Sequence, residues 1–77
     1  MDFVYTAHAE ESIKERKLSK KSIENVVRNP EKVIEGRYGR KIAQRRMGSK
    51  LLRVVYDREN NVYIVVTAYH TKHERYG

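Results

Sequence analysis

The segment RKIAQRRMGSKLLRVVY, residues 40–56, decides the fold. On both sides of Gly48-Ser49 it has the period of two residues that strands have, and a two-residue turn with glycine first favours an antiparallel hairpin. Residues 36–56 contain seven arginines and lysines and no aspartate or glutamate. The hairpin therefore carries a concentration of positive charge into the middle of a sheet.

Two helices are expected before this hairpin. Residues 6–17 begin at Thr6, a residue that can cap a helix, and have acids in the first turn and bases in the last, as the helix dipole favours. A second helix begins after Ser19, another good cap, and has apolar residues at the i, i+3, i+4 spacing of one buried face. Pro30 ends it, because proline disfavours a helical conformation at the residue before it.

Further strands are expected around the hairpin, at residues 31–36 and 62–70, in addition to 40–47 and 50–57. The fold class predicted is α+β, with two N-terminal helices packed on one face of a four-stranded antiparallel sheet. The segment FVYT, residues 3–6, could add a short extra strand.

Composition limits the function classes. A chain of 77 residues predicts a single domain, residues 1–77, and the absence of cysteine excludes disulfides and thiolate metal sites. No apolar run is long enough to cross a membrane, so a soluble, cytoplasmic protein is expected. The net charge of +7 favours an anionic partner such as nucleic acid or an acidic protein, although a basic surface also serves solubility.

Hairpin register predicts which side chains share a face. A turn at Gly48-Ser49 places Gln44 opposite Arg53, and a turn at 59–60 or 58–61 places Arg53 opposite Val66. An odd shift or a bulge would exchange the two faces. One face then has a cluster of polar and basic residues, and the other is left for the helices. The polar face comprises Arg40, Gln44, Arg46, Arg53 and His70.

This cluster suits phosphate, because a guanidinium group presents a planar fork of donors to phosphate oxygens. Cleavage of RNA also requires an acid or base, and His70, or His73 and Tyr76 in the tail, could supply it. The sheet has no closely spaced carboxylate pair and the histidines have no metal-ligand spacing, so we expect no metal and no cofactor. A nuclease of this kind would leave a 2′,3′-cyclic phosphate.

Several of these residues also have purely structural interpretations. Arg53 could pair with Asp57 or Glu35 inside the fold, and His70 could be an ordinary surface histidine. His8 and Arg16 share one stripe of the first helix and could line a second site or form its polar outer face.

The order of helices and the segment RRMGSKLLRVVYDRENNVYIVVTAYHTKHERY resemble the RelE/ParE superfamily of bacterial and archaeal toxins. The matching features are Gly48, the strand Arg53-Val54-Val55-Tyr56, the Asn60-Asn61 turn and the Ile64-Val65-Val66 strand. The opening, with His8-Ala9, Arg16 and Ser19, is similar to an uncharacterised branch of small domains of that superfamily. This chain departs from the branch pattern at Ser12 and Lys17, which leaves open an orphan domain with degraded activity.

The resemblance implies a toxin-type, metal-independent endoribonuclease that acts on free or ribosome-bound messenger RNA and is neutralised by an acidic antitoxin. It implies that Arg53 stabilises the scissile phosphate, with Lys72 or Arg75 and the C-terminal Tyr76 as further functional residues. Relatives of the ParE type lack the nuclease residues and inhibit DNA gyrase, so a non-catalytic binding module is the alternative. The site predicted has Arg53, His70 and Tyr76 as catalytic residues. The nucleic-acid-binding residues predicted are Arg40, Gln44, Arg45, Arg46, Lys50, Lys72 and Arg75.

Overall fold

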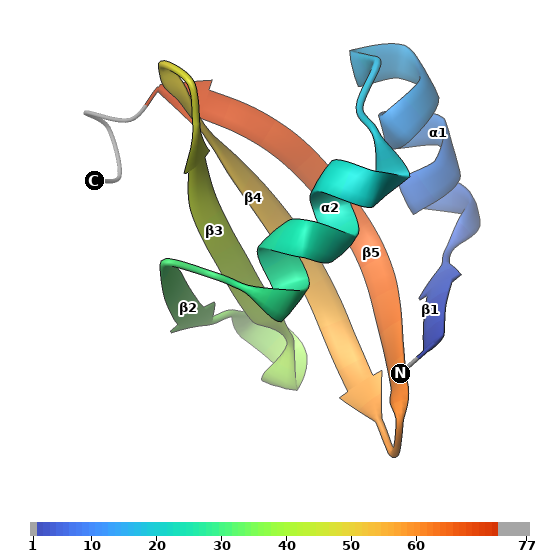
Figure 1. Cartoon of the computed structure of the whole chain (residues 1–77). Coiled ribbons are helices and arrows are strands. Elements are labelled where there is room, and N and C mark those ends of the chain that lie inside the picture. The colour runs from blue at the N-terminus through green and yellow to red at the C-terminus, as the bar shows by residue number, and fades with distance from the viewer. Residues whose placement is uncertain (1, 73–77) are drawn as a thin grey trace.

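A computed structural model of the chain describes residues 2–72 as two helices lying on one face of a curved sheet (Figure 1). The helices are α1 (Ala7–Arg16) and α2 (Lys20–Arg28), and a 3₁₀ turn, η1, covers Arg37–Gly39. The strands are β1 (Asp2–Tyr5), β2 (Lys32–Glu35), β3 (Lys41–Met47), β4 (Lys50–Glu59) and β5 (Val62–Lys72). The α+β class and the N-terminal position of both helices are as predicted.

The helices begin and end where their capping residues require. The Thr6 hydroxyl accepts a hydrogen bond from the Ala9 amide at 3.0 Å, and the Ser19 hydroxyl accepts one from the Ser22 amide at 3.3 Å. These bonds satisfy amides that have no partner within the first turn of a helix. The second helix ends at Arg28, before Asn29 and Pro30. Neither α1 nor α2 has the length and apolar character that crossing a lipid bilayer demands.

The sheet has five strands, in the order β1-β5-β4-β3-β2. The prediction of four antiparallel strands was therefore wrong. The short N-terminal segment does form a strand, and β1 pairs in parallel with β5 from Asp2 opposite Val62 to Tyr5 opposite Val65. The other pairs are antiparallel, so the sheet is mixed. The first strand thus lies beside the last, a long-range pairing that local pattern does not reveal.

The hydrophobic core lies between the helices and one face of the sheet. Ile23, Val26 and Val27 of α2 and Ala9 and Ile13 of α1 form the helical side of this core. The sheet contributes the buried residues Ala43, Leu52, Val54, Tyr56, Val65 and Ala68. Because strand side chains alternate, residues 51, 53 and 55 of β4 point to the opposite face.

Two tyrosine hydroxyls at the margin of this core are shielded from water. Tyr5 donates a hydrogen bond to Glu24 at 2.7 Å, and both its burial and this carboxylate raise the pKa of the Tyr5 hydroxyl above its usual value. Burial likewise raises the pKa of Tyr56, whose ring meets that of Tyr63 edge to face at 5.5 Å. The tyrosines on this side therefore have structural roles.

A β-bulge changes the register between β4 and β5. The turn lies at Asn60-Asn61, and Tyr56 pairs with Val65, but the next pair is Val55 with Thr67, which leaves Val66 as the extra residue. Arg53 consequently lies opposite Tyr69, not opposite Val66 as predicted. The bulge exchanges the expected faces for the second half of β5.

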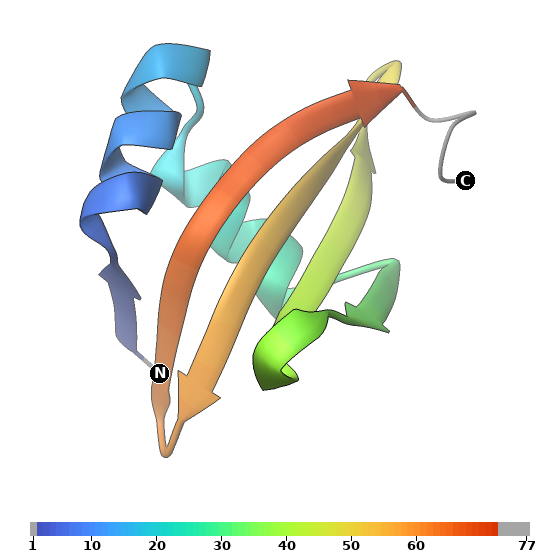
Figure 2. The same cartoon turned by 180° about the vertical axis from the view of Figure 1, so that it is seen from behind.

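The face opposite the helices is uncovered by any helix or strand of residues 2–72, as the view from behind shows (Figure 2). We call it the open face. The register places Ile42, Gln44, Arg46, Leu51, Arg53, Val55 and Tyr69 on it. Of these, Gln44, Leu51 and Arg53 are buried, so the centre of the open face is packed and its margins are exposed.

Candidate nucleic-acid interface

Gln44 and Arg53 form the centre of the open face. They lie directly opposite each other on β3 and β4, as the hairpin register predicted. Both are buried, with 4% of Gln44 and 5% of Arg53 exposed to solvent. The guanidinium carbon of Arg53 lies 5.8 Å from the centre of the Tyr69 ring, within the range of a cation–π contact. Three neighbouring strands, β3, β4 and β5, thus hold an amide, a guanidinium and a phenol ring in one cluster.

The amide oxygen of Gln44 is buried and accepts no hydrogen bond from any residue of 2–72. Buried side-chain oxygens of this kind are almost always satisfied in folded proteins, because losing water without gaining a partner costs free energy. A donor group of a ligand or an ordered water would satisfy such an acceptor.

Replacing Gln44 with leucine is expected to raise the free energy of unfolding by about 1 kcal/mol, because the side chain keeps its volume and loses the unsatisfied oxygen. Urea denaturation of both proteins measures the change. Glu15→Gln, at an exposed residue of α1, serves as a control for a polar change at the surface. A Gln44→Leu protein less stable than the wild type would show that the amide is already bonded within the fold.

Arginines at the margins of the open face have different surroundings. Arg46 is exposed, and its backbone amide donates to Glu31 at 2.8 Å. Arg40 is half-buried and forms an ion pair with Asp57 at 3.4 Å. Lys41 pairs with Glu35, and this carboxylate raises the pKa of the Lys41 ammonium. The two carboxylates considered as partners for Arg53 are thus engaged with Arg40 and Lys41.

Two of the predicted binding residues lie on the helix side. Arg45 donates to the backbone carbonyl of Asn29 at 2.9 Å, at the end of α2, so it stabilises the helix end and does not point to the open face. Lys50 is exposed beside the hairpin turn, opposite Met47, which packs against the core. Neither residue joins the cluster at Arg53.

His70 is not beside Arg53, contrary to the prediction. It lies opposite Leu52, a core residue on the helix side, and it is exposed. The bulge at Val66 is the reason, because an unbroken ladder would have placed His70 opposite Leu51 on the open face, whereas the bulge places it opposite Leu52 on the helix side. Lys72 ends β5, but its side chain is outside the description, as are His73, Arg75 and Tyr76 altogether.

The stripe of His8 and Arg16 on α1 packs partly against β5. The buried Ser12 hydroxyl lies 3.2 Å from that of Thr67, and Arg16 donates to the carbonyl of Ala68 at 3.2 Å. His8 is exposed. Ser12 and Arg16 therefore attach α1 to the sheet. Within residues 2–72 no cluster of three or more histidine, aspartate or glutamate residues could hold a metal ion.

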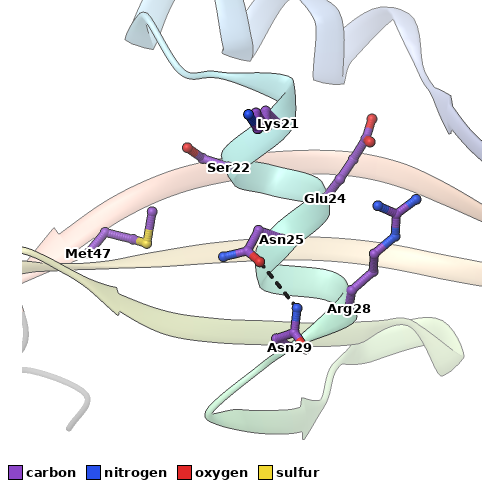
Figure 3. A pocket seen from close by; sticks show the side chains of 7 residues that line it. All are labelled: Lys21, Ser22, Glu24, Asn25, Arg28, Asn29 and Met47. Carbon is purple, nitrogen blue, oxygen red and sulfur yellow. Dashed lines mark hydrogen bonds between the residues drawn. The ribbon is translucent and has the colours of Figure 1, made fainter.

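A pocket of about 400 Å³ lies elsewhere, on the outer side of α2 (Figure 3). Its lining comes from α2, from Asn29 and from Met47, and the amides of Asn29 and Asn25 are hydrogen-bonded across it at 3.2 Å. None of the predicted site residues lines this pocket. The cluster of predicted residues and the pocket thus lie on opposite sides of the sheet.

Two aromatic residues of the open side were missed by the reasoning from sequence. Tyr69 was not among the residues predicted for the polar face, and only the bulge brings it to Arg53. Tyr38, in η1, is 89% exposed. The signal for Tyr38 was present in the sequence, since it is an aromatic residue between Gly36-Arg37 and Gly39-Arg40 in a tight turn.

A family model described as "Domain of unknown function (DUF4258)" matches residues 5–70, from the end of β1 almost to the end of β5. The chain belongs to the DUF4258 family. The match includes both helices, the hairpin with Gln44 and Arg53, and Tyr69. No curated protein and no solved structure is detectably similar to the chain. Membership in DUF4258 names no activity, so the function must be argued from the open face.

Proposed function

We propose that this DUF4258 protein binds RNA on its open face and cleaves it without a metal ion, as a toxin-type endoribonuclease. The observation that supports the proposal is the position of Arg53 beside Gln44 and Tyr69 on the face that the helices leave uncovered. A guanidinium group in a poorly solvated environment interacts more strongly with phosphate than one in open water. The resemblance to RelE-type toxins, in which this arginine holds the scissile phosphate, points to the same residue.

In the proposed reaction, the 2′-hydroxyl attacks the phosphorus and the bond to the 5′-oxygen breaks, which gives a 2′,3′-cyclic phosphate and a free 5′-hydroxyl. Solvent takes the 2′-hydroxyl proton and supplies the proton of the leaving 5′-oxygen, while Arg53 neutralises the charge that develops on the phosphate. The Gln44 amide oxygen accepts a hydrogen bond from the bound nucleotide, and Arg46 contacts the neighbouring phosphate from the exposed margin. The positive net charge attracts an acidic antitoxin as well as RNA. An antitoxin bound to the open face would therefore block RNA binding.

The test incubates the protein with RNA in EDTA, with and without ribosomes, and measures binding at several salt concentrations. Arg46→Ala is expected to reduce the slope of log affinity against log salt by about 0.7, the contribution of one phosphate contact on a single strand. Lys14→Ala, which removes an exposed charge from α1 on the helix side, is the matched control and should leave the slope unchanged. Cleavage that requires an added divalent metal, or equal effects of both variants, would contradict the proposal.

A non-catalytic binding module is the second candidate, and the position of His70 favours it. An exposed imidazole opposite Leu52 cannot serve a phosphate held at Arg53 on the other face. Salt-sensitive RNA binding without cleavage, with or without ribosomes, would select this candidate.

A further inference from the structure

Tyr38 differs in its surroundings from the other tyrosines in residues 2–72. It is 89% exposed, whereas Tyr5, Tyr63 and Tyr69 are half-buried and Tyr56 is buried. An isolated exposed tyrosine is unremarkable by itself. The conformation of its turn and the charges beside it are what make Tyr38 informative.

The backbone of Tyr38 is left-handed, with φ 60° and ψ 31°. This conformation is unfavourable for a bulky residue with a β-carbon, and it persists only where the surroundings impose it. Here Gly36 donates to the Arg40 carbonyl at 2.7 Å, and Arg40 donates to the Arg37 carbonyl at 3.2 Å. The Lys41–Glu35 ion pair closes the base of the same turn. The ring of Tyr38 is therefore displayed by a fixed turn and is not part of a loose loop.

One positive charge beside Tyr38 is available to a ligand. Arg40 and Lys41 are paired with Asp57 and Glu35, but the exposed Arg37 forms no ion pair with any residue of 2–72. The turn that carries Arg37 and Tyr38 lies on the side of the sheet away from both helices (Figures 1 and 2). The turn is thus on the same side of the sheet as Arg53, and it comes shortly before the first residue of β3 in the chain.

The Tyr38 ring and the Arg37 guanidinium group have no apolar residues around them in the turn, and this suits a nucleic acid better than a protein partner. Protein-binding hot spots are surrounded by contacts that exclude water, and the neighbours of Tyr38 in its turn are glycine and arginine. Single-stranded nucleic acids, in contrast, are held by isolated rings on which bases stack and by cations that contact the phosphates.

We propose that Tyr38 is a stacking platform for an unpaired base of single-stranded RNA and that Arg37 contacts the adjacent phosphate. This inference rests on the proposed function and specifies its substrate class as single-stranded RNA. The seven residues of β3 separate the turn from the hairpin end, so the RNA would run along β3, from Tyr38 past Gln44 to Arg46.

Fluorescence anisotropy with a labelled single-stranded RNA of about ten nucleotides tests the inference. Tyr38→Gly removes the ring and the strained β-carbon together. It is expected to raise the melting temperature while weakening RNA binding about tenfold, so misfolding cannot explain the loss. Tyr38→Phe keeps the ring and should bind within about twofold of the wild type.

The salt dependence separates stacking from charge. Tyr38→Gly should leave the slope of log affinity against log salt unchanged, whereas Arg37→Ala should reduce it by about 0.7. Unchanged RNA affinity in Tyr38→Gly, with weakened binding in Arg46→Ala, would overturn the stacking role and leave the RNA-binding face intact. Absence of RNA binding by the wild type would instead overturn the proposed function itself, and with it this inference.

Discussion

Replacing Ile23 with alanine is expected to lower the free energy of unfolding by about 3 kcal/mol, the middle of the range for large-to-small changes in a packed core. Ile23 is fully buried, with 0% of its surface exposed, and belongs to the face of α2 that packs on the sheet. A chain of this length has a total stability of roughly 4 to 12 kcal/mol, so the change removes a large part of it. The melting temperature should fall by about 15 °C.

Thermal unfolding followed by circular dichroism measures this effect. Ile23→Val removes one methylene group and should cost about 1 kcal/mol. Val33→Ala, at a residue of β2 that is 46% exposed, should change the stability by less than about 0.5 kcal/mol. A small effect of Ile23→Ala, similar to that of Val33→Ala, would mean that α2 does not pack on the sheet as described.

The β3–β4 hairpin was predictable because its determinants are local. Gly48 and Ser49 form a two-residue turn, and Gly48 has φ 67°, the left-handed value that such turns require and glycine adopts freely. Once this turn is fixed, alternation assigns every residue from Gln44 to Arg53 to a face. The helices were predictable for a similar reason, because Thr6 and Ser19 cap the turns that follow them.

The register of β5 was not predictable. The segment VYIVVT, residues 62–67, is apolar on both faces, so a shift by one residue leaves its pattern almost unchanged. Nothing in this run marks Val66 as the extra residue of a bulge. The pairing of β1 with β5 was not predicted for another reason. The four residues of β1 give little pattern, and their partners on β5 are about sixty positions away.

One odd shift changes the chemistry expected of the site. Without the bulge, the His70 imidazole would share the open face with Arg53, opposite Leu51. With the bulge, His70 is on the other face, and Tyr69 lies opposite Arg53 and contributes a ring face and a hydroxyl. The burial of Arg53 was equally beyond sequence reasoning, because alternation assigns a face but not an exposure. Arg53 therefore shares its face with the Tyr69 ring and not with the His70 imidazole.

Replacing Arg53 with lysine is expected to lower the rate of RNA cleavage by about a hundredfold to a thousandfold, the usual cost of removing one group that stabilises charge in a transition state. Lysine keeps the charge but loses the planar fork that matches two phosphate oxygens, so RNA binding should fall much less than cleavage. Single-turnover cleavage in EDTA and anisotropy with the same RNA measure the two effects.

Arg58→Lys is a control for this change at an exposed arginine of the same strand. Arg58 is also on β4, and its guanidinium carbon lies 5.6 Å from the Tyr63 ring, much as that of Arg53 lies 5.8 Å from the Tyr69 ring. The two arginines nevertheless point to opposite faces, because they are five residues apart on β4. Loss of cleavage in Arg53→Lys alone would locate the reaction on the open face. Equal losses in both variants would mean that the tyrosine contact, and not a bound phosphate, is what each arginine provides.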